Sequence, residues 1–528
     1  MTDAESDVLQ EIRDLLRSFS EEISDYEDFV LPLNRLVLGA SQNETYRNVM
    51  ASSEKIWRRI GECFLAPESY HLRSSNEETR FWYFRIYKGV VLLARNLCVD
   101  NQEYAQKLTL QDKLFKSFNI LAALPRYDEI EIALFKTSLE FLCNATAKST
   151  AFDKSSMQHT LQFLCYPIGN RFEGNEPLLI SYALLIRNLT AHDDFVYYFL
   201  KADEAHQVLH EFLLLQITEG HTKLPSTAHD RDFQTSELST LTTVVISALM
   251  RICCHESFAP FIQNIQEVNP TIFLDYLKIS HLLITSYESW DKFQLTSIMT
   301  WSYKLLVDTV TQIRTYFENS HNDEDMAAHL HGQLVIVLDM FTTLSPYEHV
   351  REFLIFYKGI DLLVSLLHVF QTELLRFNIY KLANGEVSEV RVMDGKGQKV
   401  TNQELIDSRI DRSTGLIKPT NFPECKLLVV EIISFLAHNN RKVQDKIREL
   451  QGLEVVLSNC VIDDNDPFIK ERSIMCIKHL LQDNEENQYI VAQMEAKTAV
   501  QDSALSSAGY QINIGDNGKV QLAQNKTV

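Results

Sequence analysis

An internal repeat is the sequence feature that most constrains how this chain folds. Similar five-residue segments stand at the ends of successive apolar stretches. Examples are Ala94-Arg95-Asn96-Leu97-Cys98, Leu139-Glu140-Phe141-Leu142-Cys143 and Ile186-Arg187-Asn188-Leu189-Thr190. Their fourth residues, Leu97, Leu142 and Leu189, follow one another at 45 and 47 residues, and Leu436 and Leu480 are 44 apart. Periods of about 40–47 residues are typical of HEAT and armadillo arrays, whose helical units bury their apolar faces against their neighbours. We therefore expect an all-α, armadillo/HEAT-like α-solenoid.

The composition agrees with long helices. The 528 residues include 16 Gly and 12 Pro, about half the average usage of roughly 7% and 5%. Tight turns depend on these two residues, so a sandwich, a barrel or a doubly wound sheet of this size is disfavoured. The hydrophobic fraction of 45% is sufficient for an extensive core.

Two repeats are too long, which predicts insertions. The step from Leu189 to Cys253 contains the polar segment 218–237, which has no helical period and reads as a loop. The step from Phe341 to Leu436 contains 380–425. Within it, 389–392 and 398–401 flank Asp394-Gly395, a turn signal that predicts a β-hairpin and loop projecting from the helices.

The ends of the chain differ from the middle. A helical stripe in the first residues predicts a capping helix, and alternation around Asp516-Asn517-Gly518 predicts a second hairpin or a disordered tail. The predicted order is N-terminal capping helices (1–60), armadillo-like repeats (61–379), the hairpin insertion (380–425), a C-terminal helical domain (426–498) and a tail (499–528).

Charge and cysteine usage exclude several classes of protein. A net charge of −21 disfavours binding to nucleic acid or to an anionic membrane surface. No apolar run reaches the roughly 20 residues of a spanning helix, and the acidic N-terminus does not read as a secretory signal. The nine cysteines are widely spaced without a C-x-x-C pair, which is typical of a reducing compartment. We expect a cytoplasmic protein without membrane insertion.

One stretch is more specific than a generic repeat. Residues 426–493 contain Gln444-Asp445-Lys446, Leu450-Gln451-Gly452-Leu453, Leu457-Ser458-Asn459-Cys460, Ile462-Asp463-Asp464-Asn465-Asp466-Pro467-Phe468 and Asp483-Asn484-Glu485-Glu486-Asn487-Gln488. This stretch resembles the C-terminal domain of the ataxin-10 family, and the hairpin insertion resembles its fungal branch, which also carries the name copper transport protein 86. The resemblance implies a cytoplasmic armadillo-like protein that regulates cytokinesis, without catalytic residues or a cofactor.

The same motif also has a structural interpretation. Asp466 is placed to cap a following helix whose first turn would hold Pro467. Gly452 follows a predicted helix end, where glycine can adopt the left-handed conformation, and Gly359 occupies the equivalent place one repeat earlier.

The sequence does not indicate a catalytic site or a metal-binding site. Cu(I) favours thiolate or thioether ligands, yet the chain has no paired cysteines or Met-rich tract. The densest group of metal-ligand residue types is His321, Asp323, Glu324, Asp325, His329 and His331. We interpret it as an acidic helix start. Because G-x-S-x-G and H-E-x-x-H are also absent, we predict no catalytic, cofactor-binding or metal-binding residues.

A surface for protein partners is the remaining hypothesis. In armadillo proteins an Asn at the third position of the repeated segment can bind a peptide backbone. Asn96 and Asn188 fit, but the other repeats have Phe141, Ile252, Met340, Phe435 and His479. The candidate contacts are Arg95, Asn96, Arg187, Asn188, Lys478 and His479. The alternative is that these residues are ordinary solvated helix ends.

The predicted function is accordingly a non-enzymatic scaffold that binds proteins and acts in cell division. Two alternatives remain open, a metal (copper) homeostasis factor and a chaperone or assembly factor. The sequence identifies no partner and leaves self-association open.

Overall fold

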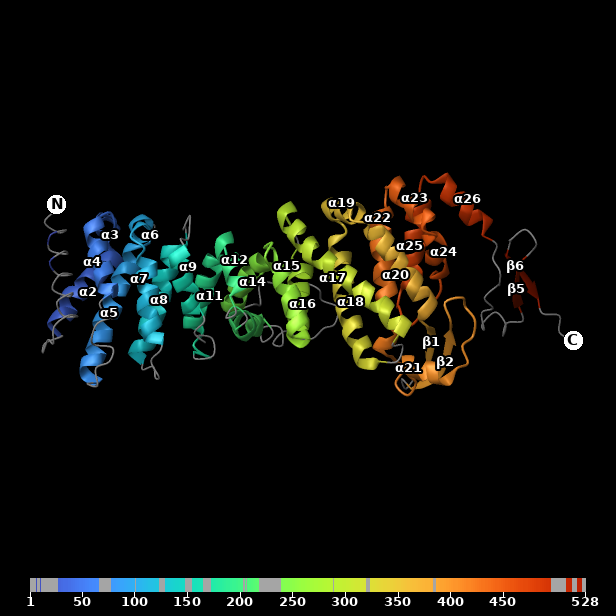
Figure 1. Ribbon diagram of the computed structural model, residues 1–528, viewed down its shortest axis with the longest axis horizontal. Helices are drawn as coiled ribbons and strands as arrows, with labels where there is room; N and C mark the ends of the chain where they lie inside the picture. Colours follow the sequence, from blue (N-terminus) through green and yellow to red (C-terminus); the bar gives the residue numbers. More distant parts are fainter. Residues whose placement is uncertain are drawn as a thin grey trace. The chain divides into compact units, whose positions relative to one another are not determined.

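A computed structural model shows the fold (Figure 1). It describes Ser6, Gln10, Ala205 and the ranges 27–65, 77–99, 101–122, 129–147, 154–164, 172–202, 207–217, 239–287, 289–319, 323–382, 386–494, 510–514 and 520–524. The predicted N-terminal stripe before residue 27 and the predicted loop 218–237 lie outside these residues.

The chain is mostly helical and divides into two compact units, Met1–Trp301 and Ser302–Val528. Helix α17 (Lys292–Asn319) runs across the boundary. The first unit contains α2 (Glu27–Gln42), α3 (Glu44–Ala51), α4 (Glu54–Leu65), α5 (Glu77–Leu97), α6 (Glu103–Lys107), α7 (Leu110–Ala122), α8 (Glu129–Thr146), α9 (Lys154–Leu164), α11 (Glu176–Leu189), α12 (Asp193–Lys201), the π-helix η3 (Gln207–Leu214), α14 (Thr240–Cys253), α15 (Phe258–Val268) and α16 (Pro270–Ser286).

The repeated segments lie on helices that pack consecutively. In the first unit α2 packs on α5, α5 on α8, α8 on α11 and α11 on α14, while α4, α7 and α9 form a second row (Figure 1). The spacing residues Leu97, Leu142, Leu189 and Cys253 stand near the C-terminal ends of α5, α8, α11 and α14, and all four are buried. The sequence repeat is thus the repeat of one helix row.

The second unit, taken by itself, shows the same kind of packing. Its helices are α18 (Glu324–Leu344), α19 (Glu348–Phe356), α20 (Gly359–Glu373), α21 (Gln403–Arg409), α22 (Cys425–Ala437), α23 (Arg441–Glu449), α24 (Gly452–Ser458), α25 (Ile469–Leu481) and α26 (Glu485–Gln493), with a 3₁₀ turn η4 (Pro419–Asn421). Helix α18 packs on α22, and α22 packs on α25. Phe341, Leu436 and Leu480 are buried near the ends of these three helices.

Polar side chains, rather than glycines, begin many of the helices. Side-chain oxygens accept hydrogen bonds from backbone N–H groups of the first turn of α3, α11, α14, α16, α18, α23 and α26. The residues that supply them are Asn43, Asn175, Ser239, Asn269, Asp323, Asn440 and Asn484. Such caps satisfy N–H groups that have no partner inside the helix.

The hairpin of the predicted insertion has a partner strand that was not expected. Strand β2 (Val387–Met393) contains the predicted segment 389–392 and pairs antiparallel with β1 (Arg376–Lys381). The expected partner, 398–401, also meets the end of β2 across the predicted turn: Met393 and Lys399 form an antiparallel bridge, and the Val400 amide donates to the Val392 carbonyl at 3.1 Å. The sequence analysis missed β1, which follows α20 almost directly and carries an apolar residue, Phe377, that pairs with Val392 in a buried cluster.

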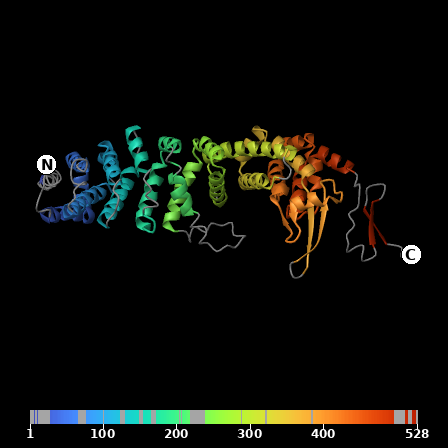
Figure 2. The same ribbon diagram turned by 60° about the horizontal axis from the view of Figure 1, so that its bottom comes forward.

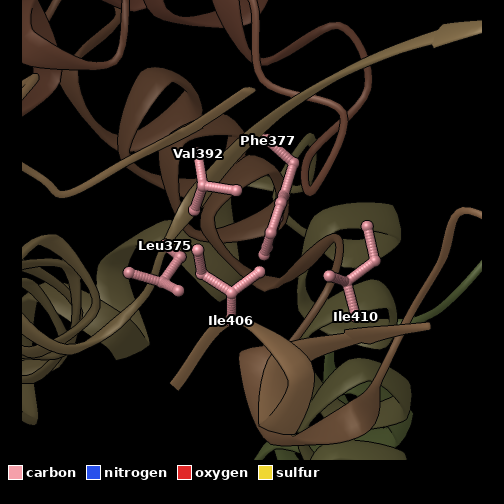
Figure 3. Close-up of a cluster of buried hydrophobic side chains, with 5 residues drawn as sticks. All are labelled: Leu375, Phe377, Val392, Ile406 and Ile410. Carbon is pink, nitrogen blue, oxygen red and sulfur yellow. The ribbon is translucent and has the colours of Figure 1, made fainter. Parts of the chain in front are cut away.

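That cluster gives the insertion a small apolar core. Its members are Leu375 just before β1, Phe377 of β1, Val392 of β2, Ile406 of α21 and Ile410 of the short strand β3 (Ile410–Asp411) (Figure 3). Strand β3 pairs with β4 (Leu416–Ile417). Figure 2 shows β1 and β2 side by side, extending beyond the orange helices of the second unit.

The structure corrects the prediction that Gly452 and Gly359 have a left-handed backbone conformation. The residues before them, Gln451 (φ 59°) and Lys358 (φ 61°), take that conformation. Gly452 instead begins α24, where an added Cβ would lie 2.7 Å from Cγ2 of Ile447. Gly359 begins α20, where an added Cβ would lie 2.9 Å from a backbone oxygen. Close packing, and not backbone conformation, requires glycine at these positions.

Candidate partner-binding surface

The six candidate residues stand at the C-terminal ends of three row helices. Arg95 and Asn96 end α5, Arg187 and Asn188 end α11, and Lys478 and His479 lie in the last turn of α25. The first four belong to the unit Met1–Trp301 and the last two to Ser302–Val528. They are therefore considered as separate sets.

Asn96 is a structural link between two helices. Its side chain is buried, and Nδ2 donates to the Val37 carbonyl of α2 at 3.3 Å. Its Oδ1 accepts from Nε and Nη2 of Arg95 at 3.3 and 3.1 Å. Both ends of the amide are thus engaged within the chain.

Asn188 makes the same kind of link further along the row. Its Nδ2 donates to the Cys143 carbonyl near the end of α8 at 3.0 Å. Asn144 similarly donates to the Arg95 carbonyl near the end of α5 at 3.2 Å. Since the last carbonyls of a helix lack partners inside it, these amides satisfy groups that burial would otherwise penalise. The geometry gives Asn96 and Asn188 the role of linking neighbouring helices.

The charge of Arg95 is paired with a carboxylate on the neighbouring helix α8. Its guanidinium forms an ion pair with Glu140 of α8, and Lys136 approaches the same carboxylate at 3.9 Å. Glu140 occupies the repeat position that corresponds to Arg95 one helix earlier. The Arg95 guanidinium is therefore paired within the chain.

The next helices carry a different arrangement. Arg187 and Arg251 occupy the corresponding position on α11 and α14, and Nη1 of Arg251 donates to the Arg187 carbonyl. Within the described part of the chain, no ion pair includes either guanidinium. Burial, and then the charge of Arg187, lower the pKa of Arg251. Burial and the Arg251 charge likewise lower the pKa of His192 beside them, against the opposing effect of Asp193 and Asp194.

We call the two arginines, Arg187 and Arg251, the cationic spot, and His192 lies beside them. The sequence analysis selected Arg187 but missed Arg251 and His192. Arg251 could have been found, because Met250-Arg251-Ile252 is a copy of the repeated segment with arginine at the same position. No sequence signal indicated His192, which comes from the turn before α12.

Lys478 and His479 lie in a different environment. Lys478 is exposed, whereas Nδ1 of His479 lies 3.0 Å from Oγ of Ser434 on α22. The His479 ring stands 4.7 Å from the ring of His438, centroid to centroid. Burial lowers the pKa of His479, as do the nearby His438 and Lys478. His479 thus joins α25 to α22, and Lys478 alone projects to solvent.

The family motif at 462–468 forms a buried polar network. Nζ of Lys426 lies 2.7 Å from Oδ2 of Asp463 and 3.4 Å from Oδ2 of Asp466, and all three side chains are almost fully buried. Although burial disfavours the Lys426 ammonium, the two carboxylates outweigh it and raise the pKa of Lys426. Burial also raises the pKa of Asp466, against the effect of Lys426.

This network also holds the hairpin. Oδ1 of Asp463 accepts from the Phe377 amide at 3.1 Å, and Oδ2 of Asp464 accepts from the Ile379 amide at 2.5 Å. The Asp464 amide in turn donates to the Phe377 carbonyl at 2.8 Å. The motif therefore anchors strand β1.

Asp466 does not cap the helix that follows it, contrary to the prediction. Its Oδ1 accepts from the Leu427 amide in the first turn of α22 at 3.1 Å. Helix α25 begins later, at Ile469, after Phe468 with φ 68°. The local spacing suggested a cap on α25, but the fold brings a second helix start to the same carboxylate.

The histidine and acidic group near residue 325 is also divided between structural roles. Asp323 caps α18 through the Met326 amide at 2.9 Å, and Glu324 pairs with Lys418 at 2.8 Å. Nε2 of His331 lies 3.0 Å from the Pro423 carbonyl. His321 lies outside the described residues. In the described ranges there is no group of three or more His, Cys, Asp or Glu residues that could hold a metal ion.

Burial suppresses the reactivity of several thiols. It raises the pKa of Cys98 and of Cys143 to about 12. Because the thiolate is the metal ligand, these environments disfavour metal binding at both positions.

No single helix among the described residues is long and apolar enough to cross a membrane. Two bent pairs, Thr240–Cys253 with Phe258–Val268 and Glu348–Phe356 with Gly359–Glu373, meet the length and composition of a span only together.

Comparison with known proteins places this chain in a family. The family model described as "Spinocerebellar ataxia type 10 protein domain" matches residues 425–523. An Ataxin-10 homolog of Candida glabrata is 40% identical over 98% of this chain and 98% of its own length, and one of Saccharomyces cerevisiae is 35% identical over 95% and 92%. Ataxin-10 of Xenopus tropicalis is 35% identical over 18% of this chain and 20% of its own length. The family suggested by residues 426–493 is thereby confirmed: the chain belongs to the ataxin-10 family.

Proposed function

We propose that this chain is a non-enzymatic, cytoplasmic scaffold that binds proteins and takes part in regulating cytokinesis. In this proposal the consecutively packed helices form an armadillo-like solenoid, with the hairpin region as an insertion. Such arrays use a long row of helix ends to contact partners. Family membership supports the proposal, and the geometry of the row suggests where a partner binds.

The cationic spot is the observation that carries the proposal. The Arg251 guanidinium binds the backbone carbonyl of Arg187, and the charge of Arg187 contributes to lowering the pKa of Arg251, so two arginine charges lie near each other on a chain whose net charge is −21. Arginine presents a planar fork of donors that matches a carboxylate. We infer that an acidic segment of a protein partner binds here. A nucleic acid would need many more basic groups along its phosphates.

The charge reversal Arg187→Glu tests this site. The variant keeps the hydrogen bond between Arg251 and the Arg187 carbonyl, because that bond uses only the backbone of residue 187. It places a carboxylate beside Arg251 and so neutralises the spot. We expect recovery of the partner in affinity purification with mass spectrometry to fall at least about tenfold, since charge-assisted hydrogen bonds contribute roughly 1.5–3 kcal/mol.

The matched control is Arg58→Glu. Arg58 is an exposed arginine on α4 whose partner is Glu54 in the same helix. Its reversal should leave both recovery and the thermal unfolding midpoint unchanged. If the Arg187→Glu variant and the unmodified chain recovered equal amounts of the partner, the cationic spot would not be the binding site.

The division role is tested in cells that depend on this chain. After its depletion, the unmodified chain should restore separation of daughter cells, and Arg187→Glu should restore it less well. Normal division in depleted cells would contradict the role in cytokinesis. Stoichiometric copper in the purified protein would favour a metal homeostasis factor, and co-purified immature subunits would favour an assembly factor.

A further inference from the structure

A cluster of aromatic rings lies exposed at the end of helix α19. The ring of Tyr357 stands 4.4 Å from that of Phe353 and 5.0 Å from that of Phe356, measured between centroids. Tyr303 of α17 adds a fourth ring, 5.7 Å from Phe353 and 6.3 Å from Tyr357. Phe356 is 79% exposed and Tyr357 52%, whereas the other two are partly buried. We call these four residues, all in the unit Ser302–Val528, the aromatic patch.

The fold does not require aromatic residues at these positions. Helix α23 is the counterpart of α19, because each ends just before a left-handed residue and the glycine that begins the following helix. In this alignment Phe356 corresponds to Glu449 and Phe353 to Lys446. Glu449 is exposed, and Lys446 pairs with Asp361 at 3.2 Å. Helix α19 thus carries rings where α23 carries charges, and exposed rings that packing does not require indicate a contact surface.

The rings of the aromatic patch are held in place before any partner binds. The Tyr303 hydroxyl donates to the Tyr357 carbonyl at 2.6 Å. Tyr303 meets Phe353 at 79° and Phe356 meets Tyr357 at 77°, which is the edge-to-face arrangement that aromatic pairs prefer. Because side chains that are already ordered lose little freedom on association, this arrangement favours binding.

The size of the aromatic patch distinguishes a short segment from a second copy of the chain. An aromatic side chain offers roughly 150–250 Å², so the exposed parts of Phe356 and Tyr357 together amount to about 200–330 Å². A stable dimer buries about 800 Å² on each partner. Glu352 and Lys358, both exposed, flank the patch in the sequence and limit its apolar extent. The patch therefore fits a few side chains of a linear segment.

The chemistry of the patch favours proline. The Tyr357 amide donates to the Phe353 carbonyl at 3.0 Å, and the Tyr357 carbonyl accepts from Tyr303, so the backbone here is already hydrogen-bonded and does not favour an added strand. A polyproline II segment has no internal hydrogen bonds, and aromatic side chains line the grooves that recognise it. This chain contains no P-x-x-P. Its predicted C-terminal hairpin, β5 (Tyr510–Ile514) paired with β6 (Val520–Gln524), has no proline in either strand. The occupant therefore comes from another protein.

We propose that the aromatic patch binds a proline-rich segment of a protein partner in the polyproline II conformation. Contact between its rings and the prolines, rather than charge, supplies the affinity. The site is therefore independent of the cationic spot and of any role in division, and Arg187→Glu should leave binding at the patch unchanged.

Binding of a fluorescein-labelled peptide of ten prolines to the full-length chain tests the proposal. Fluorescence anisotropy should show saturable binding with a Kd below about 1 mM. Phe356→Ala should weaken this binding about fivefold or more, because truncation of a residue that anchors an interface costs at least that factor. Since Phe356 is 79% exposed, the thermal unfolding midpoint should stay unchanged, which separates lost binding from lost folding.

The matched control is Phe293→Ala. Phe293 is 86% exposed in the first turn of α17 and belongs to the unit Met1–Trp301, so its removal should leave binding of the proline peptide unchanged. Binding that does not saturate below about 1 mM, or that Phe356→Ala and Phe293→Ala weaken equally, would overturn the proposal. A dimer of the unmodified chain that Phe356→Ala dissociates in sedimentation would assign the patch to a second copy. A leucine-rich helical peptide that binds while the proline peptide does not would assign it to a partner helix. Either result would equally overturn the proposal.

Discussion

Lys426 places a positive charge in the interior of the second unit, where it meets the carboxylates of Asp463 and Asp466. Removing charges from water is costly, and a buried pair compensates only when its remaining hydrogen-bonding groups are also satisfied. Asp463 meets this condition through the amides of Phe377 and Asn465 at 3.1 and 3.0 Å. The network therefore depends on every member being present.

Replacing Lys426 with methionine should destabilise the chain strongly. The substitution keeps much of the volume but leaves two buried carboxylates without their cation, which typically costs about 3–5 kcal/mol. Urea unfolding followed by the circular dichroism of the helices should show a clear loss of stability. Lys470→Met, on a partly buried lysine of α25, is the control and should have little effect. Equal midpoints for both variants would contradict the importance of the network.

The same residues show what sequence can and cannot predict at this scale. The motif around Asp466 was sufficient to suggest the family, because identity at fixed spacing is a property of the sequence. Its contacts with Leu427 and with strand β1 join positions far apart in the chain. Asn96 was selected for a related reason, since its repeat position was visible while its bond to Val37 was not. Long-range partners depend on packing that local spacing does not contain.

The observed helices agree with the sequence prediction where the repeat of about 45 residues is regular. Buried residues at the ends of α5, α8 and α11 coincide with the predicted repeat, because a helix face and its repeat length are both encoded locally. The hairpin was predicted near β2, but its partner β1 was not. A turn signal identifies where strands reverse, whereas the choice of partner depended on burying Phe377 with Ile406 and Ile410.

His331 connects helix α18 to the segment just before α22. Its Nε2 lies 3.0 Å from the Pro423 carbonyl, and burial lowers its pKa below 6.5 despite the opposing effects of that carbonyl and of Glu424. Below pH 6.5 the unfolded chain therefore binds a proton at His331 more readily than the folded chain does. Stability from this histidine is fully present above pH 6.5 and is lost as the pH falls toward its lower folded-state pKa.

We expect His331→Gln to reduce the acid sensitivity of the fold. The free energy of unfolding of the unmodified chain should fall between pH 7.5 and 5.5, and the variant should show a smaller fall from a lower starting value. Urea unfolding at the two pH values measures both quantities. His329→Gln, two positions earlier on the same helix, should reproduce the pH dependence of the unmodified chain. An unchanged dependence in His331→Gln would contradict this assignment.

At the scale of the whole molecule, the helices of each unit contact mainly their neighbours in the row. Helix α8 packs on α5 and α11, and α22 packs on α18 and α25. In such an array, stability is approximately a sum of terms for each repeat and for each interface between neighbours. The scarcity of Gly and Pro predicted helices, and the spacing of the repeats predicted their row. The division into Met1–Trp301 and Ser302–Val528 left no signal in composition, because it falls inside the continuous helix α17.

The final prediction concerns how far a local defect spreads along the chain. Leu142 is fully buried on α8, so Leu142→Ala should cost about 2–5 kcal/mol through lost contacts and a cavity. If neighbours alone share that cost, hydrogen exchange should accelerate in α5, α8 and α11 and stay unchanged in α22 and α25. The reciprocal variant Leu436→Ala, on α22, should reverse the pattern. Equal acceleration in both units by either substitution would mean that the chain unfolds as one cooperative body, and additive terms for each repeat would then be the wrong description of its stability.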